Sequence, residues 1–334
     1  MPEGDTIYRA AAALRTALVG RPMQSFEAPY LVGLQPGVGR VIEEIESFGK
    51  HLEFAWDDGV VLHTHLRMTG SWHLYHPGER WRRPQREMVV SITVDQWQAV
   101  CFNAPLVETY RSFDKRRHPG FGHLGPDLTK DNPNIDECLD RIDRFADQDE
   151  PIAEVLLDQR IACGVGNVFK SEVLWICGVS PFRAVSELDA ATRRTILETA
   201  SAQLRENRMR VRRVTVANAP GGHAVYGRNG LPCPRCHEAV RVRRTGQHLR
   251  ATYWCPTCQA APKSAMLTEV TPTGLVRPRL MDAEQEAAER YLDEHDQRWA
   301  RTHRLRDDVG QHRPMTWSTR ISSATRSSRS AGGR

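Results

Sequence analysis

The first part of the chain combines one helical pattern with a long stretch of alternating pattern. Between residues 5 and 20, apolar residues recur at helical spacing and a glycine closes the run, which predicts a helix. Asp5 or Thr6 can cap its start, so we expect its N-terminus to point at Pro2 and Glu3.

From residue 41 to residue 102 the period changes to two, as in the segments HLEFAW, VVLHTHL and MVVSITV. This alternation predicts antiparallel strands, and the Asp-Asp-Gly sequence at 57–59 predicts a hairpin turn. One helix with several antiparallel strands predicts a β-sandwich.

The pattern of the second part is helical. Helices are predicted around 137–146 and over 152–159, 168–176 and 189–206. The segment CGVGN at 163–167 is too short for a strand and predicts a tight double turn. Residues 282–304 are compatible with a further helix, and the last residues have the composition of a disordered tail.

Composition narrows the class of protein. Of the 334 residues, 40% are apolar and 26% are charged, and no run approaches the roughly 20 apolar residues that cross a bilayer. The N-terminus carries acidic residues where a signal peptide has basic ones. We therefore expect a cytoplasmic globular protein with no membrane partner.

Positive charge is concentrated in one region. Residues 205–250 contain eleven arginines, no lysine and two acidic residues, so this stretch carries +9 while the whole chain carries +5. Such a field attracts polyanions, and guanidinium groups suit forked contacts to phosphate. Any single arginine can instead lie on a solvated face, but the cluster favours a nucleic-acid partner.

Two cysteine pairs have the spacing of a zinc site. Cys233 and Cys236 form one C-x2-C sequence, Cys255 and Cys258 form another, and 18 residues separate the pairs. This spacing predicts one tetrahedral Zn²⁺ on a ribbon hairpin, and four thiolate ligands leave no open position, so the metal is structural. Two disulfides or four free thiols are the alternatives, and the absence of a secretory signal disfavours disulfides.

Four motifs in order resemble one enzyme family. The segments MPEG, HLRMTGSW, LLDQRIACGVGNVFKSEVLW and VYGRNGLPCPRC with LRATYWCPTCQ are similar to the formamidopyrimidine-DNA glycosylase and endonuclease VIII family. These enzymes excise oxidised bases from DNA and then cut the strand. The resemblance covers residues 2–262 and does not include the tail.

The resemblance implies an α+β fold in four parts. We expect a catalytic β-sandwich domain over 1–120, a linker and helix-two-turn-helix domain over 121–226, a zinc finger over 227–262 and a partly disordered extension over 263–334. It also implies a monomer that binds damaged DNA in the cleft between its domains, close to the nucleoid, with no small-molecule cofactor.

The resemblance assigns the nucleophile to Pro2, which becomes the N-terminal residue when Met1 is removed. An α-amine is neutral at lower pH than a lysine, so it is the better nucleophile near neutral pH. A secondary amine also forms an iminium, which acts as an electron sink. Glu3 then handles protons at the sugar and the departing base. On these letters alone, a frayed chain end is the simpler interpretation.

The resemblance gives three more residues a role on the DNA. Lys50 assists elimination beside the lesion, and Arg250 holds the phosphates that flank the everted nucleotide. Asn167 contacts the DNA backbone. Around it, two glycines, a helix N-terminus and Lys170 together predict a phosphate site. Lys50 can instead be a solvated turn lysine, Arg250 can be one more surface arginine, and a lone Gly-x-Gly is weak evidence of phosphate binding.

Base excision requires the base to leave the stack, and the void must be filled. Met68 matches the intercalating loop of the family, Arg67 faces the orphaned base, and His123 is a candidate DNA contact. By alternation, Met68 can instead belong to the core.

Two departures from the family pattern bear on the substrate. The stretch DKRRHPGFG lacks the Pro-Arg-Arg-Phe-Gly of the oxidised-purine branch, and the start reads PEGD where that branch has PELPE. Both favour oxidised pyrimidines. The alternatives are an oxidised-purine glycosylase on the same scaffold and a damaged-DNA-binding zinc protein without catalysis.

Overall fold

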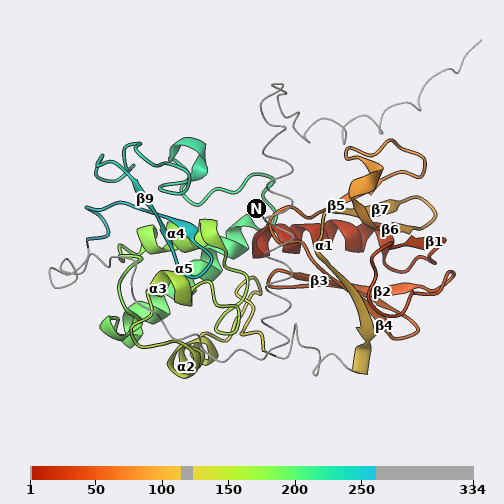
Figure 1. Cartoon of the computed structure of the whole chain (residues 1–334), viewed down its shortest axis with the longest axis horizontal. Coiled ribbons are helices and arrows are strands. Elements are labelled where there is room, and N and C mark those ends of the chain that lie inside the picture. Colours follow the sequence, from red (N-terminus) through yellow and green to blue (C-terminus); the bar gives the residue numbers. More distant parts are fainter. Residues whose placement is uncertain (1, 114–122, 261–334) are drawn as a thin grey trace, which may run out of the picture. The chain divides into compact units, whose positions relative to one another are not determined.

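The computed structural model describes residues 2–113 and 123–260 (Figure 1). The helix predicted over 282–304 and the predicted extension lie outside the described residues. The helices are α1 (Gly4–Leu18), α2 (Ile135–Phe145), α3 (Ile152–Val155), α4 (Asn167–Ile176) and α5 (Ala190–Asn207), with 3-10 turns at Gln85–Glu87, Val185–Glu187 and Pro220–Gly222. The strands are β1 (Ser25–Glu27), β2 (Ile42–Phe48), β3 (His51–Trp56), β4 (Val60–His65), β5 (Ser71–Tyr75), β6 (Met88–Thr93), β7 (Gln98–Phe102), β8 (Leu106–Arg111), β9 (Arg241–Thr245) and β10 (Arg250–Trp254).

Strands β1 to β8 form the predicted sandwich of two antiparallel sheets. The strand orders are β1-β6-β7-β5 and β2-β3-β4-β8. The apolar residues of both sheets share one core with the buried face of α1, which contributes Ile7, Leu14 and Leu18. The predicted turn at 57–59 joins β3 to β4, where Gly59 adopts φ +77°. The β-sandwich prediction is confirmed.

Helices α2 to α5 bury a second core, and the predicted helices are present with one difference. The run predicted over 152–159 is helical only over α3. The carboxylate of Asp158 accepts a hydrogen bond from the backbone N–H of Arg160 at 2.9 Å, and the side-chain amide of Gln159 donates to the carbonyls of Leu157 and Val165. These local side-chain bonds compete with the helical ladder and end it early.

The paired cysteines flank the hairpin of β9 and β10. Arg250 of β10 pairs with Thr245 of β9, and the two strands run antiparallel. A small apolar cluster beneath the hairpin includes Trp175 of α4, Val240 and Cys255. Among the described residues, no helix is long and apolar enough to span a bilayer.

Candidate active site

The fully buried side chain of Glu3 caps the N-terminus of α4. Its carboxylate accepts hydrogen bonds from the backbone N–H groups of Gly166, Val168 and Phe169 at 3.0, 2.8 and 3.2 Å. This is the usual arrangement of an anion at a helix N-terminus. We expected these N–H groups to face a DNA phosphate; in the structure they bind Glu3 instead.

Glycines allow the N-terminal segment to lie against the 163–167 turn. A Cβ added at Gly166 would lie 2.5 Å from Cγ and Cδ of Glu3, and one added at Gly4 would lie 2.5 Å from Cγ2 of Thr129. The backbone N–H of Gly4 donates to the carbonyl of Gly164 at 2.9 Å. Residues 3 and 4 are therefore fixed by the turn, and the partly exposed Pro2 precedes them directly.

The start of α1 differs from the prediction. Glu3 occupies the cap position but its side chain bonds to α4, and Asp5 lies inside the first turn. Asp5 instead accepts two hydrogen bonds from Arg213, one of them from Nε at 2.8 Å. The cap prediction for Asp5 or Thr6 is wrong because a residue far along the chain takes the Asp5 carboxylate.

Arg213 is a site residue that the sequence reasoning did not single out. Its guanidinium lies 3.7 Å from the Glu3 carboxylate and 4.7 Å from the centre of the Phe169 ring. It therefore places a partly buried cation between Glu3 and Asp5. In the sequence it is one of several neighbouring arginines, and no pattern distinguishes it from Arg210 or Arg212.

Lys50 lies in the turn between β2 and β3. Burial lowers the pKa of its ammonium group to about 8, the negative charge of Glu3 opposes this shift, and the positive charge of Arg250 adds to it. The turn is held by Gly49, which has φ +56° and donates its N–H to Asp127 at 2.9 Å. A Cβ added at Gly49 would lie 3.2 Å from the backbone nitrogen of Gly164, so Lys50 follows a residue that packs on the same turn as Glu3 and Gly4.

Arg250 begins β10 and its side chain is exposed. Its charge acts on two lysines: burial lowers the pKa of Lys170 to about 8, the carboxylate of Glu154 opposes that shift, and Arg250 adds to it as it does for Lys50. The hairpin of β9 and β10 therefore presents an accessible guanidinium.

Lys170 is fully buried, unlike a residue that contacts DNA. Its ammonium group donates to Oδ1 of Asn167 at 2.7 Å and to Oγ1 of Thr252 at 2.8 Å. We expected Lys170 to bind phosphate directly. Its ammonium group instead binds acceptors inside the protein, and these bonds join α4 to β10.

The side chain of Asn167 reinforces this connection. Its amide donates to the carbonyl of Ala251, next to Arg250, at 2.7 Å. Thr252 also bonds to Thr245 on the paired strand at 2.7 Å, and Thr245 donates to Glu154 of α3 at 2.9 Å. We call Lys170, Asn167, Thr252, Thr245 and Glu154 the docking network, because together they hold the hairpin against α3 and α4.

The predicted wedge residue lies at the tip of a tight turn between β4 and β5. Met68 is 55% exposed, so the alternative of a core residue is wrong. The preceding Arg67 has φ +43°, which tightens the turn. His123 is exposed, and its backbone carbonyl accepts a bond from Arg141 at 3.5 Å.

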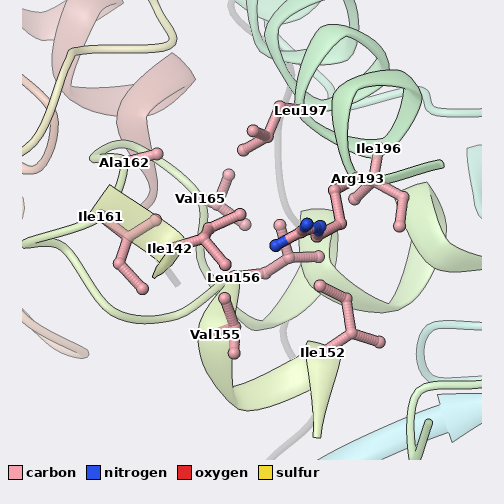
Figure 2. Close-up of a pocket in the computed structure, with 10 residues that line it drawn as sticks. All are labelled: Ile142, Ile152, Val155, Leu156, Ile161, Ala162, Val165, Arg193, Ile196 and Leu197. Carbon is pink, nitrogen blue, oxygen red and sulfur yellow. The ribbon is translucent and has the colours of Figure 1, made fainter. Parts of the chain in front are cut away.

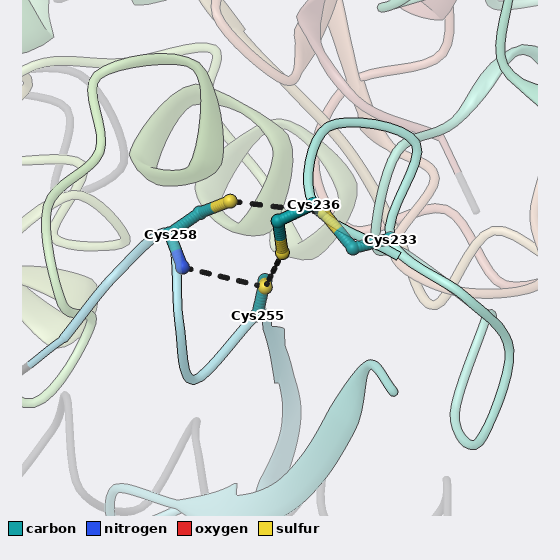
Figure 3. A group of neighbouring side chains, drawn as sticks. All are labelled: Cys233, Cys236, Cys255 and Cys258. Carbon is teal, nitrogen blue, oxygen red and sulfur yellow. Dashed lines mark hydrogen bonds between the residues drawn. The ribbon is translucent and has the colours of Figure 1, made fainter. Parts of the chain in front are cut away.

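The sulfur atoms of the four cysteines converge (Figure 3), all within 4.8 Å of one another. Cys233 and Cys258 are 3.9 Å apart, and Cys236 and Cys255 are 3.4 Å apart. In a tetrahedral ZnS₄ centre with bonds of ~2.3 Å, the sulfur atoms lie ~3.8 Å apart. Trp175 also donates its indole N–H to Cys233 at 3.3 Å, as suits a thiolate ligand.

A cavity of about 10 Å³ lies in the helical core (Figure 2). Its walls are apolar except for Arg193, whose guanidinium bonds to Asp143 at 2.7 Å. A space of this size holds about one water molecule. It is therefore a packing defect and no substrate pocket.

Comparison with known proteins gives one family for both parts of the chain. The formamidopyrimidine-DNA glycosylase N-terminal domain matches residues 1–106, and the helix-two-turn-helix (H2TH) domain of formamidopyrimidine-DNA glycosylase matches residues 124–215.

Two relatives and one solved structure agree with these matches. A probable endonuclease 8 2 of Streptomyces coelicolor is 38% identical over 78% of this chain and 95% of its own length. The DNA-(apurinic or apyrimidinic site) lyase Nei2 of Mycolicibacterium smegmatis is 36% identical over 78% of this chain and all of its own. The Lactococcus lactis Fpg (MutM) in complex with DNA containing N7-benzyl-Fapy-dG shares the fold, with a TM-score of 0.66 and 21% identity over 78% of this chain and all of that one.

Proposed function

Because the chain belongs to the formamidopyrimidine-DNA glycosylase and endonuclease VIII family, we propose that it excises oxidised bases from DNA and cleaves the strand at the resulting abasic site. One observation carries the assignment of the site: the carboxylate next to Pro2 is fixed at the N-terminus of α4, whose first residue, Asn167, also holds the strand that carries Arg250.

The nucleophile is the imino nitrogen of Pro2, freed when Met1 is removed. It forms a bond to C1′ of the deoxyribose as the bond from C1′ to the damaged base breaks. Opening of the sugar ring gives a cationic iminium, and loss of a C2′ proton then expels the 3′ phosphate. A second elimination releases the 5′ phosphate, and water returns the proline.

The surrounding residues serve this chemistry in distinct ways. Glu3 transfers protons at the sugar and the leaving base, and Arg213 keeps its carboxylate oriented. Lys50 and Arg250 hold the charged backbone next to the reacting sugar. Asn167 and Lys170 act through the docking network, by fixing the hairpin strand that carries Arg250.

Cys233, Cys236, Cys255 and Cys258 fit one structural Zn²⁺. The ion would link the two cysteine pairs at the base of the hairpin and would take no part in the reaction. Met68 fills the void left by the everted base, Arg67 meets the orphaned partner base, and His123 adds a backbone contact.

The proposed substrates are oxidised pyrimidines in the DNA of the cytoplasmic nucleoid, and the enzyme acts as a monomer with no further cofactor. The sequence departures at the N-terminus and in residues 114–122 support this choice, and the latter lie outside the described residues. The names of the relatives, endonuclease 8 2 and Nei2, support the endonuclease VIII branch of the family. The domain limits stay as proposed from the sequence.

Borohydride trapping tests the nucleophile. With an oligonucleotide that contains an abasic site, reduction should give one covalent adduct, and peptide mass spectrometry should place it on the nitrogen of residue 2. A damaged-DNA-binding protein without catalysis gives no adduct. An adduct on any lysine, or fully active protein that retains Met1, would contradict the assignment of Pro2.

A panel of duplexes tests the lesion class. Thymine glycol and dihydrouracil should be released faster than 8-oxoguanine under single-turnover conditions. The reverse order would establish the oxidised-purine alternative.

A further inference from the structure

A second group of arginines lies in the sandwich, outside the 205–250 cluster. The segment Arg80–Arg86, RWRRPQR, contains four arginines and no acidic residue, and we call it the arginine loop. The side chains of Arg80, Arg82 and Arg86 are exposed, whereas Arg83 pairs with Glu87 at 3.3 Å. The chemistry proposed above does not use this loop.

The arginine loop is anchored to the sheet. The ring of Trp81 packs against Phe102 with 5.8 Å between ring centres, and its indole N–H donates to Gln98 at 3.1 Å. The backbone N–H of Arg82 donates to the hydroxyl of Tyr75 at 3.1 Å. A ligand therefore meets arginines on a backbone that is already ordered, which reduces the entropy cost of binding.

The far end of the loop lies next to the predicted wedge turn. Thr69, which follows Met68, donates its hydroxyl to the carbonyl of Asn103 at 3.3 Å. Asn103 in turn donates its backbone N–H and its side-chain amide to Glu87, each at 2.9 Å. One residue therefore connects the turn that carries Met68 to the residue that follows Arg86.

We propose that the arginine loop binds DNA phosphates beside the Met68 turn and forms a second track for the backbone on the sandwich. This inference rests on the proposed function, because that function places Met68 in the DNA. Guanidinium groups form forked, charge-assisted bonds to phosphate, and the exposed side chains of Arg80 and Arg86 on an anchored loop can each contact a phosphate. The loop contributes to affinity and register and reads no base.

The salt dependence of DNA affinity tests the proposal. The double variant R80Q/R86Q is compared with R21Q/R40Q, which removes the same charge. Arg21 follows the end of α1 remote from Glu3, and Arg40 precedes the end of β2 remote from Lys50. Affinity is measured by fluorescence anisotropy on a duplex with a tetrahydrofuran abasic analogue, which is not cleaved.

The plot of log K against log salt has a negative slope, and each lost phosphate contact makes that slope less steep by about 0.9. The slope of R80Q/R86Q should therefore be less steep by about 1.8, with affinity at 0.1 M salt weaker by roughly tenfold or more. The R21Q/R40Q variant should keep the slope and the strand cleavage of the unmodified protein. Equal slopes in all three proteins would overturn the inference.

Neutral methylphosphonates placed one at a time along the duplex locate the contact. At the phosphates that the loop contacts, the modification should lower the DNA affinity of the unmodified protein and leave the affinity of R80Q/R86Q unchanged. Equal sensitivity at every position would contradict a local contact and favour an acidic protein as the partner of the loop. Absence of strand cleavage by the unmodified protein would refute the proposed function by itself, whatever the slopes.

Discussion

At the scale of single residues, Gly166 shows how closely the site is packed. A Cβ at this position would lie 2.5 Å from Cγ and Cδ of Glu3, so the Glu3 side chain would have to shift. We predict that Gly166→Ala displaces the carboxylate by about 1 Å and slows strand cleavage by roughly 10²-fold. Single-turnover assays on abasic DNA measure the effect.

Gly37→Ala is the matched control for this prediction. Its added Cβ would meet only the flexible side chain of Arg40, at 3.4 Å. Full cleavage by Gly166→Ala would show that the position of Glu3 does not limit the reaction.

The lowered pKa of Lys50 predicts a pH effect on DNA binding. Below pH 8 the ammonium is charged and attracts phosphate, and above pH 8 the free protein loses this charge. Affinity for a tetrahydrofuran duplex should therefore fall as pH rises through about 8. Lys50→Gln should bind weakly and lack this step, so a step of the same size in that variant would exclude Lys50 as its origin.

The residues of this site differ in how far the sequence reveals them. Pro2, Glu3 and Lys50 lie in short motifs, so the resemblance identified them. The partner of Glu3 lies 163 residues away at Gly166, and no local pattern reports such a contact. The burial of Lys170 was missed for the same reason, because its acceptor Thr252 comes from the hairpin.

At the scale of elements, Glu172 of α4 organises the segment that joins α5 to the hairpin of β9 and β10. Its carboxylate accepts bonds from the N–H groups of Ala224, Val225 and Tyr226 and from the hydroxyl of Thr215. All four partners are donors, so an amide at this position would set its NH₂ group against N–H groups.

Glu172→Gln should lower the free energy of unfolding by about 2–3 kcal/mol, because buried donors lose their acceptor. Urea unfolding followed by tryptophan fluorescence measures the change. Glu198→Gln, on the exposed face of α5, should change it by less than about 0.5 kcal/mol. Similar midpoints for both variants would show that α4 does not hold the segment.

The docking network makes a second prediction at this scale. Thr252→Val keeps the shape of the side chain but removes an acceptor from the Lys170 ammonium and a partner from Thr245. We expect a loss of about 1–3 kcal/mol in stability and slower strand cleavage, because Arg250 is no longer fixed. Thr195→Val on α5 is the control. Unchanged cleavage in a destabilised Thr252→Val protein would separate the network from the position of Arg250.

Element types were predictable from periodicity, but one element length was not. The pattern of residues 152–159 is apolar at helical positions, yet Asp158 and Gln159 bind nearby backbone groups and stop the helix at Val155. Such local competition depends on side-chain geometry that periodicity does not encode.

At the scale of the whole molecule, the cysteine spacing predicts that metal and activity are lost together. The purified protein should contain one zinc per chain, as measured by inductively coupled plasma mass spectrometry. Stripping it with a chelator should abolish strand cleavage, because the hairpin that carries Arg250 loses its base. Cys236→Ser should behave like the stripped protein, and full cleavage without zinc would refute a structural role for the metal.

The fold class was predictable because each region has its own signal: alternating strands, helical periodicity and paired cysteines. The joining of these regions was not predictable, since it depends on contacts such as those of Arg213 with Asp5 and of Asn167 with Ala251. These contacts join residues that are distant in the chain.

The hold of α4 on Glu3 has a consequence for protein synthesis. Glu3 is synthesised before residues 166–169, which supply the N–H groups that fix its carboxylate. A nascent chain with only the sandwich completed therefore lacks the N–H groups that hold the Glu3 carboxylate. Under the proposed function, strand cleavage therefore requires the helical region to be folded as well as the sandwich.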